Sequence, residues 1–259
     1  MGSGFRSARP SLASPILSAY TVSTVTEADA FEEAVRKIAD EYQRLGHRLG
    51  WRFLTTQRRT LLTAKTALIT LNPGGDYDPP EHGRESSEPG SAYLCESWDE
   101  CPPGEARLQV QVQRLFNWLG EDLNEALSAH FIPFRSPNYR DLHERKASLE
   151  FASSLWRRLL STIAPTLVIS IGGEAFKGIR KILSDIRGAP IRQSEFPVGW
   201  NKMKATLVRY HQCLLIGLPH LSRFSIFGRS DSHANACLDQ ILRAIREQRP
   251  ARSSTGLSP

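Results

Sequence analysis

The chain has 259 residues, of which 40% are hydrophobic and 23% are charged. This composition is typical of a globular protein with a buried core and excludes fibrous and disordered chains. No apolar run reaches the roughly 18 to 20 residues that a membrane-spanning helix needs, and the first residues lack the apolar centre of a secretory signal. Basic residues outnumber acidic ones by 33 to 27, a net charge of +6, which favours a polyanionic partner such as nucleic acid.

The cysteine pattern indicates reduced thiols. The four cysteines contain no Cys-x-x-Cys pair, and they stand at positions 95, 101, 213 and 237. A zinc ribbon or a dense disulfide framework is not expected from such spacing. His82 and His143 also lack partners at metal-ligand spacing. We therefore expect a cytoplasmic protein without a metal or another cofactor.

The two ends of the chain are polar and differ from the middle. We expect a flexible leader over residues 1–26, one α/β domain over residues 27–247, and a flexible tail over residues 248–259. Within the domain, apolar residues at helical spacing and short continuous apolar runs alternate. They predict, in chain order, a helix over 27–49, a strand over 67–71, a helix over 105–127 interrupted near Gly120, a strand over 129–134, a helix over 143–164, a strand over 166–171, a helix over 174–186, a strand within 207–218 and a helix over 232–248, capped by Asp231 or Ser232.

Strands that alternate with helices predict a central four-stranded parallel twisted sheet with helices on both faces. Residues 76–104 form a long loop, and residues 187–206 form a loop or a hairpin. Ligands of such sheets bind outside the carboxyl ends of the strands. Residues 72–75, 130–137 and 219–225 follow three strand ends, so we expect them to converge on one crevice.

Two of these strand ends carry distinctive sequences. Residues 71–75 have the sequence Leu-Asn-Pro-Gly-Gly, and residues 220–225 have the sequence His-Leu-Ser-Arg-Phe-Ser. The first resembles the Gly-x-Asn-Pro-Gly water-activating loop of the uracil-DNA glycosylase superfamily, and the second resembles its His-Pro-Ser-Pro-Leu-Ser loop. Weaker matches over residues 130–137 and 163–172 follow the family's order, so the resemblance covers about residues 60–245.

This resemblance implies a uracil-DNA glycosylase-like fold and a monofunctional DNA glycosylase, for repair or for attack on modified phage DNA. Such an enzyme flips a uracil or another modified or deaminated base out of the DNA and hydrolyses its N-glycosidic bond, leaving an abasic site. The implied catalytic residues are His220, which donates to the departing base, and Asn72, which holds the water. An amide orients a water but accepts no proton, so Asp76 or Asp78 is expected to assist as the base, unless both are turn residues only.

Residues of the same segments are expected to bind the extruded base and the DNA. Tyr93, or alternatively Tyr77, is expected to stack on the base. Phe224 is expected to wedge into the duplex. The expected base-binding set is Leu71, Pro73, Gly74, Gly75, Tyr93 and His130. The expected DNA-binding set is Arg135, Ser222, Arg223, Phe224 and Ser225, with Arg140 and Arg229 as further phosphate contacts.

His130 departs from the family pattern, which has an asparagine at the corresponding place. A neutral imidazole offers one donor and one acceptor on opposite sides of a ring, so it cannot reproduce the paired amide contact with uracil. Either His130 recognises a different base or it has a structural role, and uracil, hypoxanthine, xanthine and modified cytosines all stay open.

Two other functions are compatible with the sequence. One is a non-catalytic nucleic-acid-binding protein on the same fold. The other is a nucleotide-binding α/β enzyme that uses Gly172 and Gly173 as a phosphate turn, although the dinucleotide fingerprint and a Walker loop are both missing. We expect a monomer whose partner is DNA and not a membrane.

Overall fold

A computed structural model gives the conformation of Met1 and of residues 27–249. The expected leader and tail lie outside the described residues, apart from Met1 and the last two residues of the described range. The described elements, in chain order, are α1 (Glu27–Arg44), α2 (Thr60–Thr63), β1 (Thr66–Thr70), α3 (Ala92–Cys95), α4 (Arg107–Leu119), β2 (Leu127–His130), a short 3-10 helix (Tyr139–Asp141), α5 (Arg145–Ile163), β3 (Leu167–Ile171), α6 (Gly173–Arg187), β4 (Arg192–Pro197), β5 (Lys204–Tyr210), β6 (Cys213–Leu218) and α7 (Ser232–Gln248).

The fold is α/β, as the alternating pattern predicts, but its sheet is mixed. Six strands pair in the order β2-β1-β3-β6-β5-β4. The strands β2, β1, β3 and β6 are parallel to one another, whereas β5 and β4 continue the sheet in antiparallel pairing. The expectation of a four-stranded, entirely parallel sheet is therefore wrong, because an antiparallel hairpin extends one side.

The hairpin was hidden in the sequence for two physical reasons. The expected single strand within 207–218 is really two strands, since His211 and Gln212 form a tight turn in which Gln212 has φ of 61°. The outer strand β4 is mostly polar and exposed, as edge strands often are, so it has no apolar signature. The region 187–206, expected to be a loop or a hairpin, thus supplies an edge strand and part of β5.

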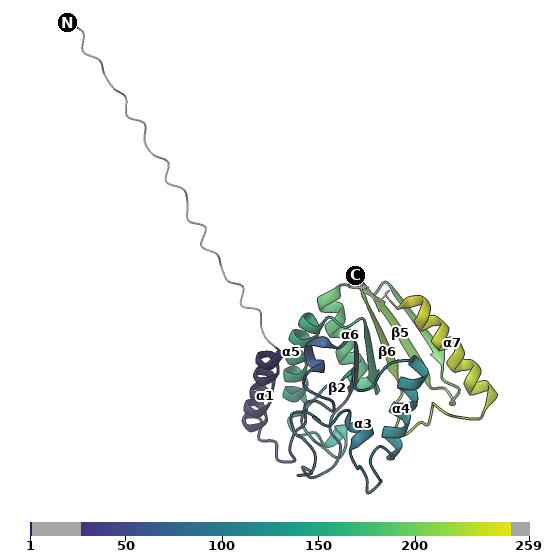
Figure 1. Ribbon diagram of the computed structural model, residues 1–259, viewed down its shortest axis with the longest axis horizontal. Coiled ribbons are helices and arrows are strands. Elements are labelled where there is room, and N and C mark those ends of the chain that lie inside the picture. Colours follow the sequence, from purple (N-terminus) through teal and green to yellow (C-terminus); the bar gives the residue numbers. More distant parts are fainter. Residues whose placement is uncertain (2–26, 250–259) are drawn as a thin grey trace, which may run out of the picture.

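Helices cover both faces of the sheet (Figure 1). The apolar faces of α1, α5 and α6 belong to one buried cluster, and those of α4 and α7 belong to the other. In β1, Ala67 and Ile69 enter the first cluster while Leu68 enters the second, which is the alternation of a strand buried on both sides. No described helix combines the length and the hydrophobicity needed to cross a bilayer.

Local signals set the ends of two helices. Helix α4 stops at Gly120, which adopts the left-handed φ of 69° that glycine tolerates best. Helix α7 begins after Asp231, whose carboxylate accepts from the backbone N–H groups of His233 and Ala234. The predicted interruption near Gly120 and the predicted Asp231 cap are both confirmed.

A segment that the sequence analysis did not single out covers the outer edge of β2. The backbone of residues 51–55 bonds to residues 128–133, with bridges between Trp51 and Phe134 and between Leu54 and Ala129. Every residue of this segment is buried. The open edge of the sheet is therefore at β4 and not at β2.

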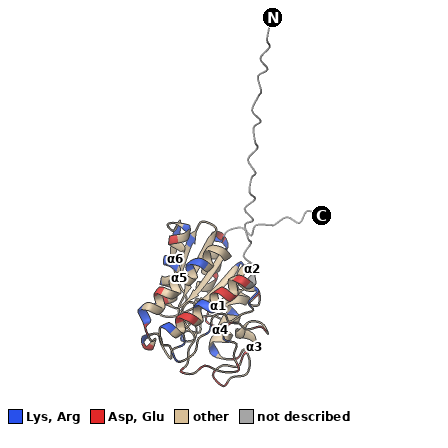
Figure 2. Cartoon of the chain, turned by 90° about the vertical axis from the view of Figure 1, so that its left-hand side faces the viewer, with Lys and Arg blue, Asp and Glu red and all other residues tan. Residues whose placement is uncertain are grey.

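The excess positive charge is not concentrated on the outer helices. Figure 2 shows basic and acidic residues interspersed along α1, α5 and α6. Arg158 pairs with Glu33 at 2.7 Å and Arg157 pairs with Asp185 at 2.6 Å, which ties neighbouring helices together. This face therefore carries a balanced charge and no concentrated positive patch.

A buried histidine gives the fold a specific sensitivity to acid. Burial, helped by the neighbouring His143, lowers the pKa of His47 to about 4, and its Nε2 lies 3.0 Å from the Ser148 hydroxyl. The unfolded chain takes up this proton near pH 6.5, so the free energy of unfolding falls by about 3 kcal/mol as the pH drops from 6.5 to 4.

Urea unfolding of wild type and His47→Gln at pH 7 and pH 4.5 measures this loss. The variant is expected to lose that part of the pH dependence, because glutamine does not titrate. His211, exposed in the turn between β5 and β6, supplies the control, and His211→Gln should keep the wild-type pH dependence. An unchanged acid loss in His47→Gln would contradict the prediction.

Candidate active site at the strand ends

The sheet topology places a switch point between β1 and β3. These strands are parallel neighbours, yet the chain leaves β1 toward β2 and leaves β3 toward the opposite side of the sheet. Such a change of direction separates the two outgoing loops, and ligands of open α/β sheets bind there. The Asn72 loop follows β1 and Gly172 follows β3, so both lie at this point.

The Asn72 side chain is oriented by acceptors around its amide nitrogen. Its Nδ2 donates to the Pro73 carbonyl at 2.9 Å, and it also approaches the Ser136 hydroxyl at 3.1 Å and the Ser136 carbonyl at 3.4 Å. Two of these partners are pure acceptors, so the nitrogen is placed unambiguously. The amide oxygen has no hydrogen-bond partner among the described residues, which leaves it able to accept from a water.

The two glycines of this loop differ. Gly75 has φ of 88°, a left-handed conformation that side chains rarely adopt, whereas Gly74 has open space where a Cβ would be. Pro73 is buried, while Leu71 keeps part of its surface exposed. The turn itself therefore requires glycine only at position 75.

Arg135 holds the Asn72 loop through a hydrogen bond to its backbone. Its guanidinium donates to the Gly74 carbonyl and lies 3.7 Å from the Asp78 carboxylate, and only 9% of its side chain is exposed. Burial lowers its pKa, and the Asp78 charge opposes that shift. Arg135 was expected to contact phosphate, and the structure instead places it inside, where it braces the loop.

The two candidate carboxylates have different environments. Asp78 is paired with Arg84 and Arg135. Asp76 is exposed and has no partner among the described residues. Asp76 follows the glycine turn directly, and of the two only Asp76 has a carboxylate without an ion-pair partner among the described residues.

His220 lies at the end of β6, against the turn that follows β3. A Cβ on Gly172 would lie 3.7 Å from the His220 ring. The Nδ1 of His220 is 2.7 Å from the Ser222 hydroxyl. Burial, reinforced by the charge of Arg223, holds the pKa of His220 below its ordinary value. The imidazole is therefore neutral at neutral pH, with Nδ1 engaged by Ser222.

Helix α4 holds the loop that contains His220. Arg107 donates to the Arg223 carbonyl at 3.0 Å and to the Ser225 hydroxyl at 3.2 Å. Gln111 accepts from the backbone N–H of Phe227 and donates to its carbonyl, both at 3.0 Å. These contacts hold residues 223–227 of the loop against α4, while the start of the loop continues directly from β6.

A groove of about 570 Å³ lies at this edge of the sheet. Its lining residues are Asn138, Tyr139, Arg140 and Arg223. Three of them follow β2 and Arg223 follows β6. In the sheet order, the ends of β1 and β3 lie between those two strands. Arg140 and Arg223 are exposed and have no ion-pair partner among the described residues. The sequence analysis expected both to contact phosphate, and the structure brings them to one groove.

His130 ends β2 as part of a small polar cluster. Its Nδ1 lies 2.8 Å from the Thr70 hydroxyl. Burial, together with the positive charges of Arg52 and Arg135, holds the pKa of His130 well below its ordinary range. Its Nε2 has no hydrogen-bond partner within the described chain. His130 is thus a neutral imidazole with one nitrogen held by Thr70 and the other available.

Tyr93 lies in the core and not on the surface of the site. Only 1% of it is exposed, and its ring packs edge-on against Trp98 at 5.1 Å. Burial raises the pKa of Tyr93 to about 12, while the Thr70 and Thr55 hydroxyls act in the opposite direction. The other stacking candidate, Tyr77, is 62% exposed and belongs to the segment after Gly75.

A buried ion pair that the sequence did not reveal anchors the loop around Tyr93. Arg52 donates to both carboxylate oxygens of Glu96, at 2.5 and 2.7 Å, and Trp98 donates to the same group at 2.9 Å. The two side chains are only 5% and 11% exposed. Burial raises the pKa of Glu96, but the hydrogen bonds and charge of Arg52 outweigh this and the pKa is lowered overall.

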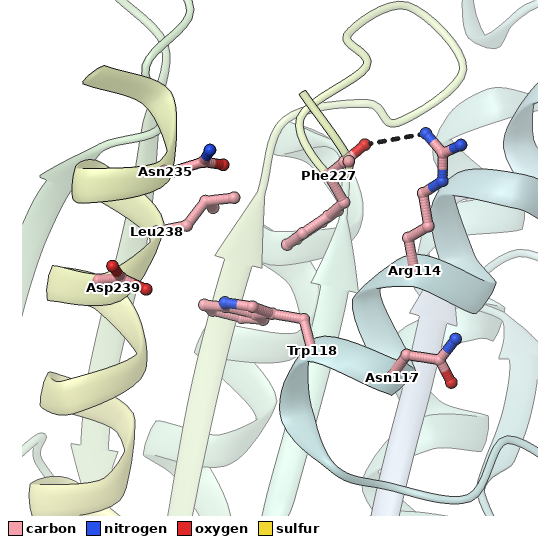
Figure 3. Close-up of a pocket in the computed structure, with 8 residues that line it drawn as sticks. Arg114, Asn117, Trp118, Phe227, Asn235, Leu238 and Asp239 are labelled. Atoms are coloured by element: carbon pink, nitrogen blue, oxygen red, sulfur yellow. Dashed lines mark hydrogen bonds between the residues drawn. The ribbon is translucent and has the colours of Figure 1, made fainter. Parts of the chain in front are cut away.

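A second cavity, of about 320 Å³, lies between α4 and α7 (Figure 3). The Trp118 and Phe227 rings lie 5.3 Å apart with their planes tilted by 47°, and the Trp118 indole N–H is buried without a partner among the described residues. Arg114 donates to the Phe227 carbonyl at 3.3 Å. No motif points to this cavity, which adjoins the continuation of the His220 loop.

The Arg52–Glu96 pair should matter far more than an exposed pair of the same geometry. Glu96→Gln leaves the Arg52 charge buried and unpaired, so we expect a loss of about 3–5 kcal/mol in the free energy of unfolding. Arg59 binds both oxygens of Glu125 in the same way, but Glu125 is 59% exposed. Glu125→Gln should therefore cost less than about 1 kcal/mol.

Chemical denaturation of the two variants beside wild type measures this difference. Similar losses of unfolding free energy in both variants would mean that the burial of Arg52 and Glu96 does not raise the cost of breaking their pair.

No protein-family model matches the chain, and no curated protein is significantly similar to it. The assignment of its function therefore depends on the residues of the site itself. Those residues are a neutral histidine, an oriented amide and two unpaired arginines at one edge of the sheet.

Proposed function

We propose that this protein is a monofunctional DNA glycosylase of the uracil-DNA glycosylase type, which removes a modified or deaminated base and leaves an abasic site. The observation that carries the proposal is that Asn72 follows β1 and His220 lies against the turn after β3, on either side of the switch point between these strands. The groove with two unpaired arginines at the same edge supports DNA as the substrate.

His220 stabilises the departing base. When the Ser222 hydroxyl donates to Nδ1, the imidazole carries its proton on Nε2. That N–H donates to an oxygen of the base as negative charge develops on it. The donor does not reorganise during the reaction, because α4 fixes the loop, and such preorganised donors contribute strongly to catalysis.

Asn72 holds the attacking water. Its amide nitrogen is occupied by Pro73 and Ser136, so the oxygen accepts from the water and points it at the sugar. The proton leaves the water as the bond to the sugar forms, and it passes to Asp76, which follows the Asn72 loop and has no ion-pair partner among the described residues. The base leaves as an anion. The remaining hydroxyl of the water bonds to the sugar carbon that held the base.

The base is recognised through a single donor or acceptor at His130. Its Nε2 is the free atom, and which role it plays depends on the proton between Nδ1 and Thr70. Tyr77 is the exposed ring that stacks on the extruded base. Uracil, hypoxanthine, xanthine and modified cytosines are all candidate substrates on this basis.

The first experiment incubates the protein with duplexes that carry each candidate base and detects abasic sites by alkaline cleavage. His220→Ala is expected to slow excision by about 100-fold to 1000-fold, since one aimed donor is lost. The matched control is His211→Ala, because His211 is exposed in the turn between β5 and β6 at the opposite end of the sheet. Asn72→Ala should also slow excision.

Other results would change the assignment. Strand cleavage without alkali would contradict a monofunctional enzyme. DNA binding without any product would favour the non-catalytic binding protein. Absence of both binding and product would exclude this proposal.

The two arginines of the groove should each contribute one phosphate contact. Arg140→Ala and Arg223→Ala are each expected to weaken DNA binding and to lower the slope of log Kd against log salt by about 1. Fluorescence anisotropy at several salt concentrations measures the slope. Arg158→Ala is the control, since Arg158 is paired with Glu33 on the outer helices. Unchanged slopes in the two groove variants would place the DNA elsewhere.

A further inference from the structure

The tip of the β4–β5 hairpin lies at the same edge of the sheet as the candidate site. Strand β6 ends there, directly before the His220 loop, and β5 runs antiparallel to β6. The last pair of the hairpin is Pro197 with Lys204, so the connecting residues 198–203 emerge at the end where β6 finishes. The mixed sheet therefore adds a fifth segment to an edge that the four parallel strands supply with four.

This tip is in contact with Phe224. The Trp200 ring meets the Phe224 ring edge-on, with centroids 6.1 Å apart. Both side chains keep part of their surface exposed and pack against the buried cluster under α4 and α7. Phe224 is thus supported from the side by a residue of another strand pair.

The tip is itself held in place. The Arg229 guanidinium lies 5.0 Å from the centre of the Trp200 ring and donates to the Gly199 carbonyl. Gly199 has φ of 69°, and a Cβ there would lie 2.5 Å from Cα of Ala234 in α7. Arg229 was expected to contact phosphate, but its guanidinium instead contacts the hairpin tip at Gly199 and Trp200. These contacts restrain Trp200.

The exposed part of the tip carries positive charge. Lys202 is exposed and has no ion-pair partner among the described residues, whereas the next lysine, Lys204, is paired with Glu195 at 2.9 Å. The exposed Arg223 belongs to the adjacent loop. An aromatic pair beside unpaired cations suits a partner with stacked rings and phosphates.

We propose that the hairpin tip, residues 198–203, is a second contact surface for duplex DNA, in which Trp200 positions Phe224 as a wedge and Lys202 contacts a phosphate. The inference rests on the proposed function and extends it to the form of the substrate. A side chain inserted between base pairs must be kept from moving aside. The contact with Trp200 restrains Phe224 in this way. Single-stranded DNA has no opposite strand and no base pair to keep open, so it does not need the wedge.

The test compares duplex and single-stranded oligonucleotides that carry the same excised base. Trp200→Ala is expected to lower excision from the duplex by roughly ten-fold or more and to leave single-stranded excision within about two-fold of wild type. Trp200→Phe keeps a ring against Phe224 and should restore most of the duplex activity. Ile191→Ala is the matched control, since Ile191 is 66% exposed at the opposite end of the same hairpin.

A binding measurement tests the same surface without requiring excision. Lys202→Ala should lower the salt slope of duplex binding by about 1, whereas Lys181→Ala on α6 should not. In wild type, 2-aminopurine beside the target base should brighten on binding, and Trp200→Ala should abolish this signal while the protein still melts cooperatively.

The outcomes separate the two proposals. Equal losses on duplex and single-stranded DNA, or no loss, would overturn the role of Trp200 and leave the glycosylase proposal intact. Normal duplex binding with a Trp200-dependent signal but no excision would reject the glycosylase and keep the surface. A wild-type protein that binds no DNA would overturn both.

Discussion

Strands β1 and β3 pair in parallel, with Thr66 opposite Leu167 and Ile69 opposite Ser170, and this register brings the ends of both strands to one level. The chain then departs in opposite directions, so the two loops separate instead of packing on each other. Every group of the candidate site depends on that separation. Asn72 stands on one side of it, and Gly172 with His220 stands on the other.

The environments of His130 and His220, the two histidines of the candidate site, keep both imidazoles neutral. Burial and nearby arginines act together at both His130 and His220, and each has one ring nitrogen beside a hydroxyl. A neutral imidazole is a directional donor and acceptor, while an imidazolium would attract DNA without discrimination. In the proposed glycosylase, the exposed arginines would therefore attract the DNA backbone, and the two partly buried, neutral histidines would contact the base.

The parallel half of the sheet was predictable because its strands are continuous apolar runs bounded by turns. The loops that follow those strands could be placed at one edge for the same reason. The polar edge strand β4 could not be predicted, since exposed strands lack an apolar signature, and Trp200 was missed with it. Long-range pairs such as Arg52 with Glu96 join residues 44 positions apart, which no local spacing reveals. Arg135 was misplaced because charge alone does not indicate which cations become buried.

The acceptors that surround the Asn72 amide nitrogen have a consequence for how this loop can change during evolution. Two carbonyl oxygens face the amide nitrogen, one from Pro73 and one from Ser136. An aspartate would present a negative oxygen to those carbonyls and would lose the donor that satisfies them. A single replacement of the amide by a carboxylate is therefore disfavoured here unless the backbone around residue 136 also changes. In the proposed glycosylase, the preference for an amide at position 72 would thus come from the surrounding backbone and not only from the identity of one side chain.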